Sequence, residues 1–301
     1  MLLSSPKCKL AHTAGRRTGL APTKPMISLR FTGRLAFGVL LAGALLAGAG
    51  CYRGPGAVAP AGPAPGVVVL PPNYDPGRAY PVVELLPPTG NTAGTLLQIY
   101  LSRVGLGRLY RDPPERQLAA LMPYLFPDAA AAGSRSRDFV LVLASGRGSG
   151  DDYRTAAAWS STIDRYEREV RADLRAVARR LRVDPTRFVV AGFSLGGDLA
   201  WALTLRNPDL LRGAIVMASR ATYRPVPALV PALRDARFFL TMGGVDDPTR
   251  RRLARAAADV LDRLGIEHRF FVLPGVAHEP APLATFAEAL DFVFRRDRNS
   301  E

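Results

Sequence analysis

A serine in a glycine-rich segment is the first candidate for chemistry. Ser194 lies at the centre of Gly192-Phe193-Ser194-Leu195-Gly196, directly after an apolar run that ends at Ala191. A sharp turn from a strand into a helix holds a serine in a strained conformation and exposes its hydroxyl. Such a turn needs small residues two positions to either side, and Gly192 and Gly196 meet this need. The segment therefore predicts a nucleophilic serine, with a turn that serves packing alone as the alternative.

A serine hydroxyl needs a base that accepts its proton. After residue 50 the sequence offers two histidines, His268 and His278. His268 begins an apolar run and is expected at the surface. His278 follows that run in a loop, where ligands bind at the carboxyl ends of parallel strands. His278 is therefore the predicted base.

The base in turn needs a carboxylate that orients its ring. Asp246 and Asp247 follow the apolar run Phe238–Met242 and the glycines Gly243-Gly244. Asp247 is the predicted acid, although an aspartate before Pro248 is also well suited to cap a helix. Because the two roles compete for the same oxygens, Asp246 stays open as the alternative.

The three candidates sit among alternating apolar runs and helical patterns. Most of these apolar runs, of four to six residues, are continuous rather than alternating, which is typical of strands buried on both faces of a parallel sheet. Helices are predicted over about 162–182, with Ser161 and Asp164 as a capping box, and over about 249–264 and 282–294. The pattern predicts a single doubly wound α/β domain with a mostly parallel sheet. The predicted strands are Val67–Leu70, Val82–Leu86, Phe139–Ala144, Phe188–Ala191, Ala214–Met217, Phe238–Met242 and Phe270–Leu273.

The domain resembles the α/β-hydrolase superfamily, and within it the esterases that include feruloyl esterases and polyhydroxybutyrate depolymerase-like proteins. The order serine, aspartate, histidine and the segments 192–197, 244–248 and 275–278 carry the resemblance. Residues 69–75 and 80–83 resemble the opening hairpin of these esterases. The resemblance implies a serine esterase that cleaves carboxylic esters of small or polymeric substrates through an acyl-enzyme. Acyl transfer on the same fold, or a non-catalytic surface-binding protein, are the alternatives.

One departure concerns the oxyanion hole. The family usually has His-Gly after the second strand, whereas this chain has Pro87-Pro88-Thr89-Gly90. Proline has no N–H, so the first possible donor is Thr89, followed by Gly90. The other expected donor is the N–H of Leu195. Either the prolines place Thr89 correctly or activity is weak.

The first fifty residues read as a leader with a signal peptide. Fifteen uncharged residues, Leu35–Ala49, follow the basic residues Lys24, Arg30 and Arg34. The apolar run is short for a membrane-spanning helix, which needs about 20 residues. Translation from Met26 would already supply a complete signal. Residues 51–66 are almost all Gly, Pro, Ala and Val and are expected to be a tether, and the catalytic domain is expected over 67–296.

Cys51 directly follows the apolar run and resembles the lipid-modified cysteine of bacterial lipoproteins. Gly48 stands where these proteins usually have leucine, and a plain cut after Ala49 is the alternative. The sequence thus predicts an exported protein, held at a bacterial envelope by lipid on Cys51 or otherwise secreted.

Charge separates the leader from the rest. Of the net charge of +14, seven positive charges come from residues 1–50, which contain no acid. The remaining arginines are scattered rather than clustered, so nucleic acid is not an expected partner. Neither a metal ion nor a cofactor is expected.

Overall fold

The computed structural model describes residues 66–71, 74–105 and 138–295. The chain divides into two units, residues 1–61 and 62–301, and every described residue belongs to the second. The predicted signal peptide, Cys51 and nearly all of the predicted tether therefore lie outside the described residues. None of the described helices is both long enough and apolar enough to cross a bilayer.

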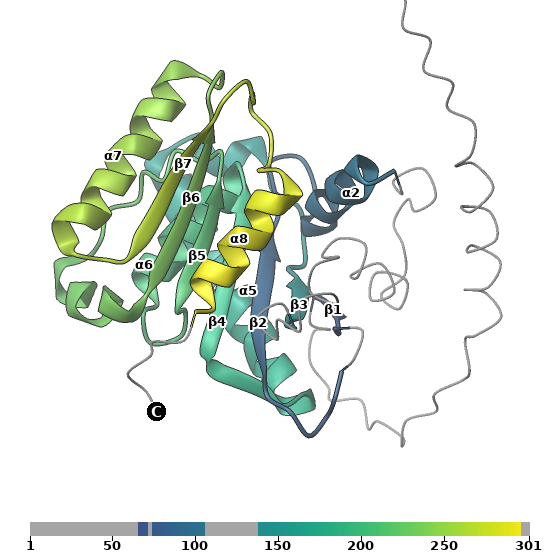
Figure 1. The fold of residues 1–301 in the computed structure, drawn as a ribbon. Coiled ribbons are helices and arrows are strands. Elements are labelled where there is room, and N and C mark those ends of the chain that lie inside the picture. Colours follow the sequence, from purple (N-terminus) through teal and green to yellow (C-terminus); the bar gives the residue numbers. More distant parts are fainter. Residues whose placement is uncertain (1–65, 72–73, 106–137, 296–301) are drawn as a thin grey trace, which may run out of the picture. The chain divides into compact units, whose positions relative to one another are not determined.

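Seven strands form one sheet in the order β1-β3-β2-β4-β5-β6-β7 (Figure 1). All strands pair in parallel except β1, which runs antiparallel to β3. Every predicted strand is present, so the doubly wound, mostly parallel sheet is confirmed. The strands are β1 Val67–Val69, β2 Tyr80–Leu86, β3 Val140–Leu143, β4 Val183–Phe193, β5 Gly213–Met217, β6 Arg237–Gly243 and β7 His268–Leu273.

Helices cover both faces of the sheet. The apolar sides of α5 (Ala156–Arg180), α6 (Leu195–Arg206) and α7 (Pro248–Leu264) share one core cluster with the first face. Helices α2 (Ala93–Arg103) and α8 (Leu283–Val293) share the other cluster with the opposite face. Two 3₁₀ segments, η2 (Gly150–Tyr153) and η3 (Pro227–Asp235), lie in the connections. The fold therefore buries the inner strands between two layers of helices, as their largely apolar sequences require, whereas the edge strands β1 and β7 remain partly exposed.

Two local predictions were wrong. The segments 67–69 and 80–86 do not form a hairpin, because β1 pairs with β3 and β2 lies between β3 and β4. Helix α5 begins six residues before its predicted start, and its cap is Thr155, whose side chain accepts a hydrogen bond from the N–H of Ala158. Ser161 and Asp164 therefore lie inside the helix.

A buried carboxyl group lies in the middle of the sheet. Glu84 of β2 is fully buried between Val142 and Val190 of the neighbouring strands. Burial raises the pKa of Glu84 well above its usual range, and the charges of Asp173 and Glu169 on α5 raise it further. The folded protein therefore holds a proton on Glu84 more tightly than the unfolded chain does.

This proton makes stability depend on pH. The contribution of Glu84 is fully present below the ordinary glutamate pKa and is lost as the pH rises toward the raised value, by at most about 1.4 kcal/mol per pH unit. Glu84→Gln cannot ionise, so its free energy of unfolding should fall less than that of the wild type between about pH 5 and 8. Denaturant unfolding across this range measures the difference, with Glu288→Gln on the exposed side of α8 as control. The same pH dependence in Glu84→Gln and wild type would contradict the expectation.

Candidate active site

Ser194 occupies the turn between β4 and α6. Its φ of 57° and ψ of −117° lie outside the regions that L-residues normally adopt. Its N–H donates to the carbonyl of Met217 at 2.9 Å, and its carbonyl accepts the N–H of Asp198 at 3.0 Å. The backbone on both sides thus fixes the strained turn that the sequence predicts.

The glycines around Ser194 allow this turn. A Cβ on Gly192 would lie 2.3 Å from the carbonyl carbon of Gly196, and a Cβ on Gly196 would lie 2.4 Å from the carbonyl oxygen of Leu86. Backbone cannot yield at such distances. The predicted need for small residues two positions from Ser194 is therefore confirmed.

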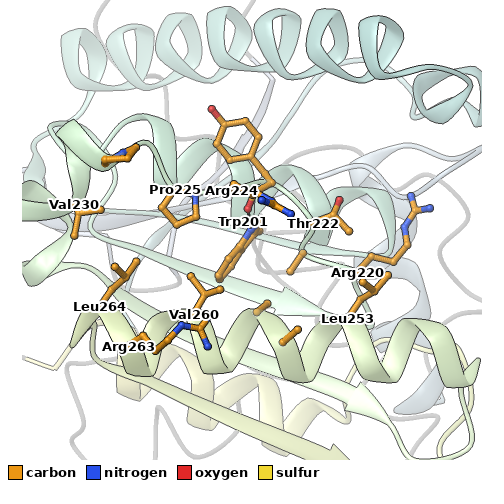
Figure 2. A pocket seen from close by; sticks show the side chains of 15 residues that line it. Trp201, Arg220, Thr222, Arg224, Pro225, Val230, Leu253, Val260, Arg263 and Leu264 are labelled. Atoms are coloured by element: carbon orange, nitrogen blue, oxygen red, sulfur yellow. Dashed lines mark hydrogen bonds between the residues drawn. The ribbon is translucent and has the colours of Figure 1, made fainter.

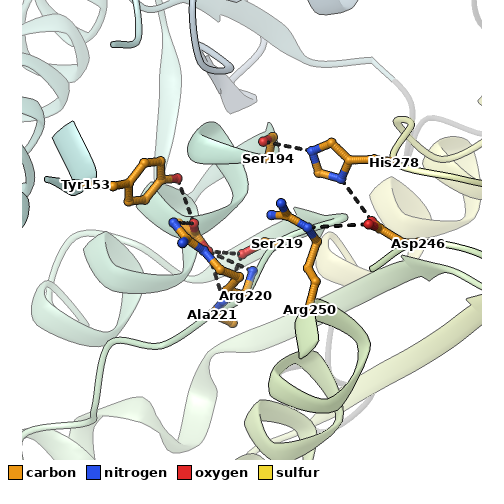
Figure 3. A network of polar contacts seen from close by, with 9 residues as sticks. Tyr153, Ser194, Ser219, Arg220, Ala221, Asp246, Arg250 and His278 are labelled. Atoms are coloured by element: carbon orange, nitrogen blue, oxygen red, sulfur yellow. Dashed lines mark hydrogen bonds and ion pairs between the residues drawn. The ribbon is translucent and has the colours of Figure 1, made fainter. Parts of the chain in front are cut away.

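Three side chains from the carboxyl ends of β4, β6 and β7 form a hydrogen-bonded row (Figure 3). His278 Nε2 lies 3.0 Å from Ser194 Oγ, and His278 Nδ1 lies 2.9 Å from Asp246 Oδ2. The side chain of Asp246 is 3% exposed and that of His278 is 36% exposed, so the row runs from a buried carboxylate to an accessible hydroxyl. This order can transfer a proton from the serine to a base whose other nitrogen is held by an anion.

The acid of this row is Asp246, so the prediction of Asp247 was wrong. Asp247 caps α7 instead: its Oδ1 accepts the N–H of Arg250 at 2.9 Å, and Pro248 follows as the first helical residue. Asp247 also donates its own N–H to Asp246 Oδ1 at 2.6 Å. Two neighbouring aspartates thus have different contacts: Asp247 caps α7, and Asp246 holds the ring of His278.

The second histidine lies apart from this row. His268 Nδ1 lies 3.0 Å from the carbonyl oxygen of Ile266, and Nε2 lies 3.7 Å from Asp262. Its side chain is 12% exposed, so it is more buried than the sequence suggested. His278 is therefore the histidine that contacts Ser194.

The predicted donors of the oxyanion hole are the backbone N–H groups of Leu195 and of Thr89 or Gly90. Gly90 donates its N–H to the carbonyl of Gly148 at 2.8 Å, which occupies that donor. Thr89 itself pairs with Gly148 in an isolated parallel bridge. Leu195 is the first residue of α6, where backbone N–H groups have no acceptor within the helix. Of the two donors considered in the loop, Thr89 is therefore the one left.

The loops that carry Asp246 and His278 hold each other. The N–H of Val245 donates to the carbonyl of Val276 at 3.0 Å. A Cβ on Gly243 would lie 2.1 Å from the carbonyl oxygen of Ala277, so glycine is needed where the loops touch. This contact fixes the distance between the carboxylate and the imidazole.

An arginine of α2 contacts the far side of the loop that carries His278, and no sequence pattern predicts this contact. Arg103 Nη1 donates to the carbonyls of Pro280 and Ala281, both at 3.1 Å, and Nη2 pairs with Glu279 at 3.0 Å. A planar guanidinium suits such multiple contacts better than a lysine would. Arg103 thus fixes the three residues that follow His278.

Asp198, a buried aspartate one helical turn after Ser194, ties three segments together through partners that Figure 3 labels, namely Tyr153, Ser219, Arg220 and Ala221. Asp198 Oδ1 accepts the Ser219 hydroxyl at 2.6 Å and the N–H groups of Arg220 and Ala221 at 2.8 and 2.9 Å. Its Oδ2 accepts the Tyr153 hydroxyl at 2.7 Å. Burial and the charge of Asp198 raise the pKa of Tyr153, so the phenol stays protonated as a donor. The network fixes the start of α6 against the loop after β5.

A cavity of about 610 Å³ opens beside His278. The ring of Phe193 lies 4.9 Å from that of His278 and forms part of the wall. Tyr153 and Trp159 do not line this cavity and pack against the core. The lining residues are Thr95, Gln98, Ile99, Ser102, Arg103, Phe193, His278, Glu279 and Pro280.

Within residues 66–71, 74–105 and 138–295, no three His, Cys, Asp or Glu side chains come together as ligands for a metal ion.

Known proteins share this architecture. The family model described as alpha/beta hydrolase fold matches residues 119–271, just over half of the chain. A CE1 ferulic acid esterase of Anaeromyces mucronatus, solved with ferulic acid, is 14% identical, with 75% of this chain and 82% of that chain covered and a TM-score of 0.52. The same esterase without substrate is 16% identical over the same shares, with a TM-score of 0.54. No curated protein sequence is significantly similar to this chain.

The sheet order, the turn at Ser194 and the family match agree. The chain belongs to the α/β hydrolase fold family.

Proposed function

We propose that this protein is a serine hydrolase that cleaves carboxylic esters through an acyl-enzyme. The observation that carries the proposal is the row Ser194 Oγ–His278 Nε2 at 3.0 Å and His278 Nδ1–Asp246 Oδ2 at 2.9 Å. The fold shared with the ferulic acid esterase of Anaeromyces mucronatus supports an ester as the substrate class.

In the first half of the reaction, Ser194 Oγ attacks the ester carbonyl carbon while His278 Nε2 accepts its proton. Asp246 holds the ring with Nε2 toward the serine and stabilises the imidazolium. The N–H groups of Leu195 and Thr89 bind the negative oxygen. The imidazolium then gives its proton to the departing alcohol, and the acyl group remains on Ser194.

In the second half, water replaces the alcohol. His278 takes a proton from the water as its oxygen attacks the acyl carbon, and the proton then passes to Ser194 Oγ as the acid leaves. If an alcohol replaced water in this step, the protein would be an acyltransferase. A non-catalytic binding protein of the same fold would show neither reaction. The cavity beside His278 is where the departing and entering groups reach Nε2.

Hydrolysis of chromogenic esters of increasing acyl length, together with an aryl cinnamate ester, tests this function. The wild type should release product from at least part of the panel. His278→Ala should lower turnover at least about 1,000-fold, leaving mainly oxyanion and binding effects. His268→Ala is the matched control and should change turnover little, because His268 contacts Ile266 and Asp262 rather than Ser194. Equal losses in both variants would contradict the assignment.

The two neighbouring aspartates permit a matched comparison. Asp246→Asn should lower turnover by about 10,000-fold, because an amide favours the wrong tautomer of the histidine. Asp247→Asn should leave turnover nearly intact and cost at most about 1 kcal/mol of stability, since asparagine also caps helices. Steady-state kinetics and thermal unfolding of both variants measure these effects. Inactive Asp247→Asn beside active Asp246→Asn would reverse the roles.

We also propose that the protein is exported and anchored by lipid on Cys51. The apolar run Leu35–Ala49, the small residues Gly48-Ala49-Gly50 and the Pro/Gly/Ala segment after Cys51 support this location. Acyl chains contribute about 0.8 kcal/mol for each buried CH₂, so several chains bind a membrane almost permanently.

Metabolic labelling with radioactive palmitate in a bacterial host tests the anchor. The wild type should carry label and fractionate with membranes, whereas Cys51→Ala should carry none because the acceptor thiol is missing. An unlabelled soluble protein that begins at Gly50 would establish ordinary signal cleavage instead.

A further inference from the structure

Helix α7 carries more apolar surface than the sheet covers. Its residues Ala254, Ala257, Ala258 and Leu261 are buried against the fold. A second apolar stripe, at the spacing 253, 256, 260 and 264, is not: Ala256 is exposed, and Leu253, Val260 and Leu264 are half-buried. The residues that pack on the sheet are thus mostly small alanines, whereas three of the larger apolar side chains of the helix lie in the second stripe.

The second stripe forms one wall of a groove of about 740 Å³ (Figure 2). The facing wall is the segment 220–230, which runs from the loop after β5 into the first residues of η3, and Trp201 of α6 forms part of the lining. The stripe extends for about 16 Å, because each helical residue advances the axis by about 1.5 Å. The groove shares no lining residue with the cavity beside His278, so it is a separate site.

The charged residues of this groove all have the same sign. Among its fifteen lining residues, Arg220, Arg224 and Arg263 are the charged ones. Arg220 pairs with Asp198 at 3.3 Å, which offsets one of the three charges. A negative group at the rim would therefore be attracted, while the apolar walls exclude water.

We infer that the groove binds an amphiphile with an alkyl chain and a terminal carboxylate, that is, a fatty acid. The chain would lie along Leu253, Val260 and Leu264, and the carboxylate would meet a guanidinium of the rim, which suits its planar shape. The volume lies within the range of about 300–1,000 Å³ of small-molecule sites, which favours a small ligand over a protein partner.

The sequence contains two tryptophans, and the fluorescence of one of them can report binding in the groove. Trp201 lines the groove, whereas Trp159 stacks on Tyr153 with ring centroids 5.3 Å apart. The full chain with Trp159→Phe and Ser194→Ala reports on Trp201 alone and cleaves no ester. A fatty acid with bromine in mid-chain should quench this fluorescence to saturation, because bromine quenches a nearby indole.

Ala256→Glu tests the position of the chain. A carboxylate in the apolar wall should weaken binding at least about tenfold, because it must lose water when the chain binds. Ala256 is exposed without ligand, so the variant should fold as the parent does, which thermal unfolding verifies. Ala157→Glu, at an exposed alanine of α5, is the matched control and should bind normally.

The charge of the head group is tested separately. The methyl ester of the same brominated acid should bind at least about tenfold more weakly, and Arg224→Gln with Arg263→Gln should abolish this preference. Absence of quenching, unchanged affinity in Ala256→Glu, or equal affinity for acid and ester would overturn the inference. Self-association that Ala256→Glu abolishes would instead assign the groove to a second copy of the chain. Because Ser194 is replaced throughout, these outcomes are independent of the proposed hydrolase activity.

Discussion

The site depends on one strained residue, Ser194, which directly follows β4 with a φ of 57°. Such a conformation costs about 1–3 kcal/mol and persists only where its surroundings enforce it. Here the enforcement is backbone on backbone: Gly192 against Gly196, Gly196 against Leu86, and the Ser194 N–H on Met217. The Asp198 network then fixes the first turn of α6 to the neighbouring loop.

Close backbone contacts also position Asp246 and His278. The close approach of Gly243 to Ala277 brings the Asp246 loop against the His278 loop, and Arg103 closes the histidine loop from α2. Each loop that contributes a reactive group is therefore held by at least two independent contacts. A proton relay with gaps of 2.9 and 3.0 Å requires such rigidity, because small displacements break it.

Much of this could be read from the sequence. The apolar runs identified all seven strands because both faces of the sheet are covered, and the glycines around Ser194 identified the turn. The predicted hairpin near the start of the domain is absent, because β1 pairs with β3, which lies some seventy residues further along the chain. Such a distant partner leaves no local pattern in the sequence. The sequence could not identify which aspartate contacts His278, because Asp246 and Asp247 are adjacent and have the same side chain. They differ only in where that side chain points in the folded protein. Arg103 contacts a loop more than 170 residues away and leaves no local signal.

The most direct measurement is the site of covalent modification by a fluorophosphonate, which reacts with a serine only when a base activates it. Mass spectrometry of peptides from the labelled wild type should place the added mass on Ser194. Ser194→Ala should remain unlabelled, while Ser219→Ala, which alters the buried neighbour on Asp198, should still be labelled. Undiminished labelling of Ser194→Ala, or modification of another serine in the wild type, would contradict a nucleophilic Ser194.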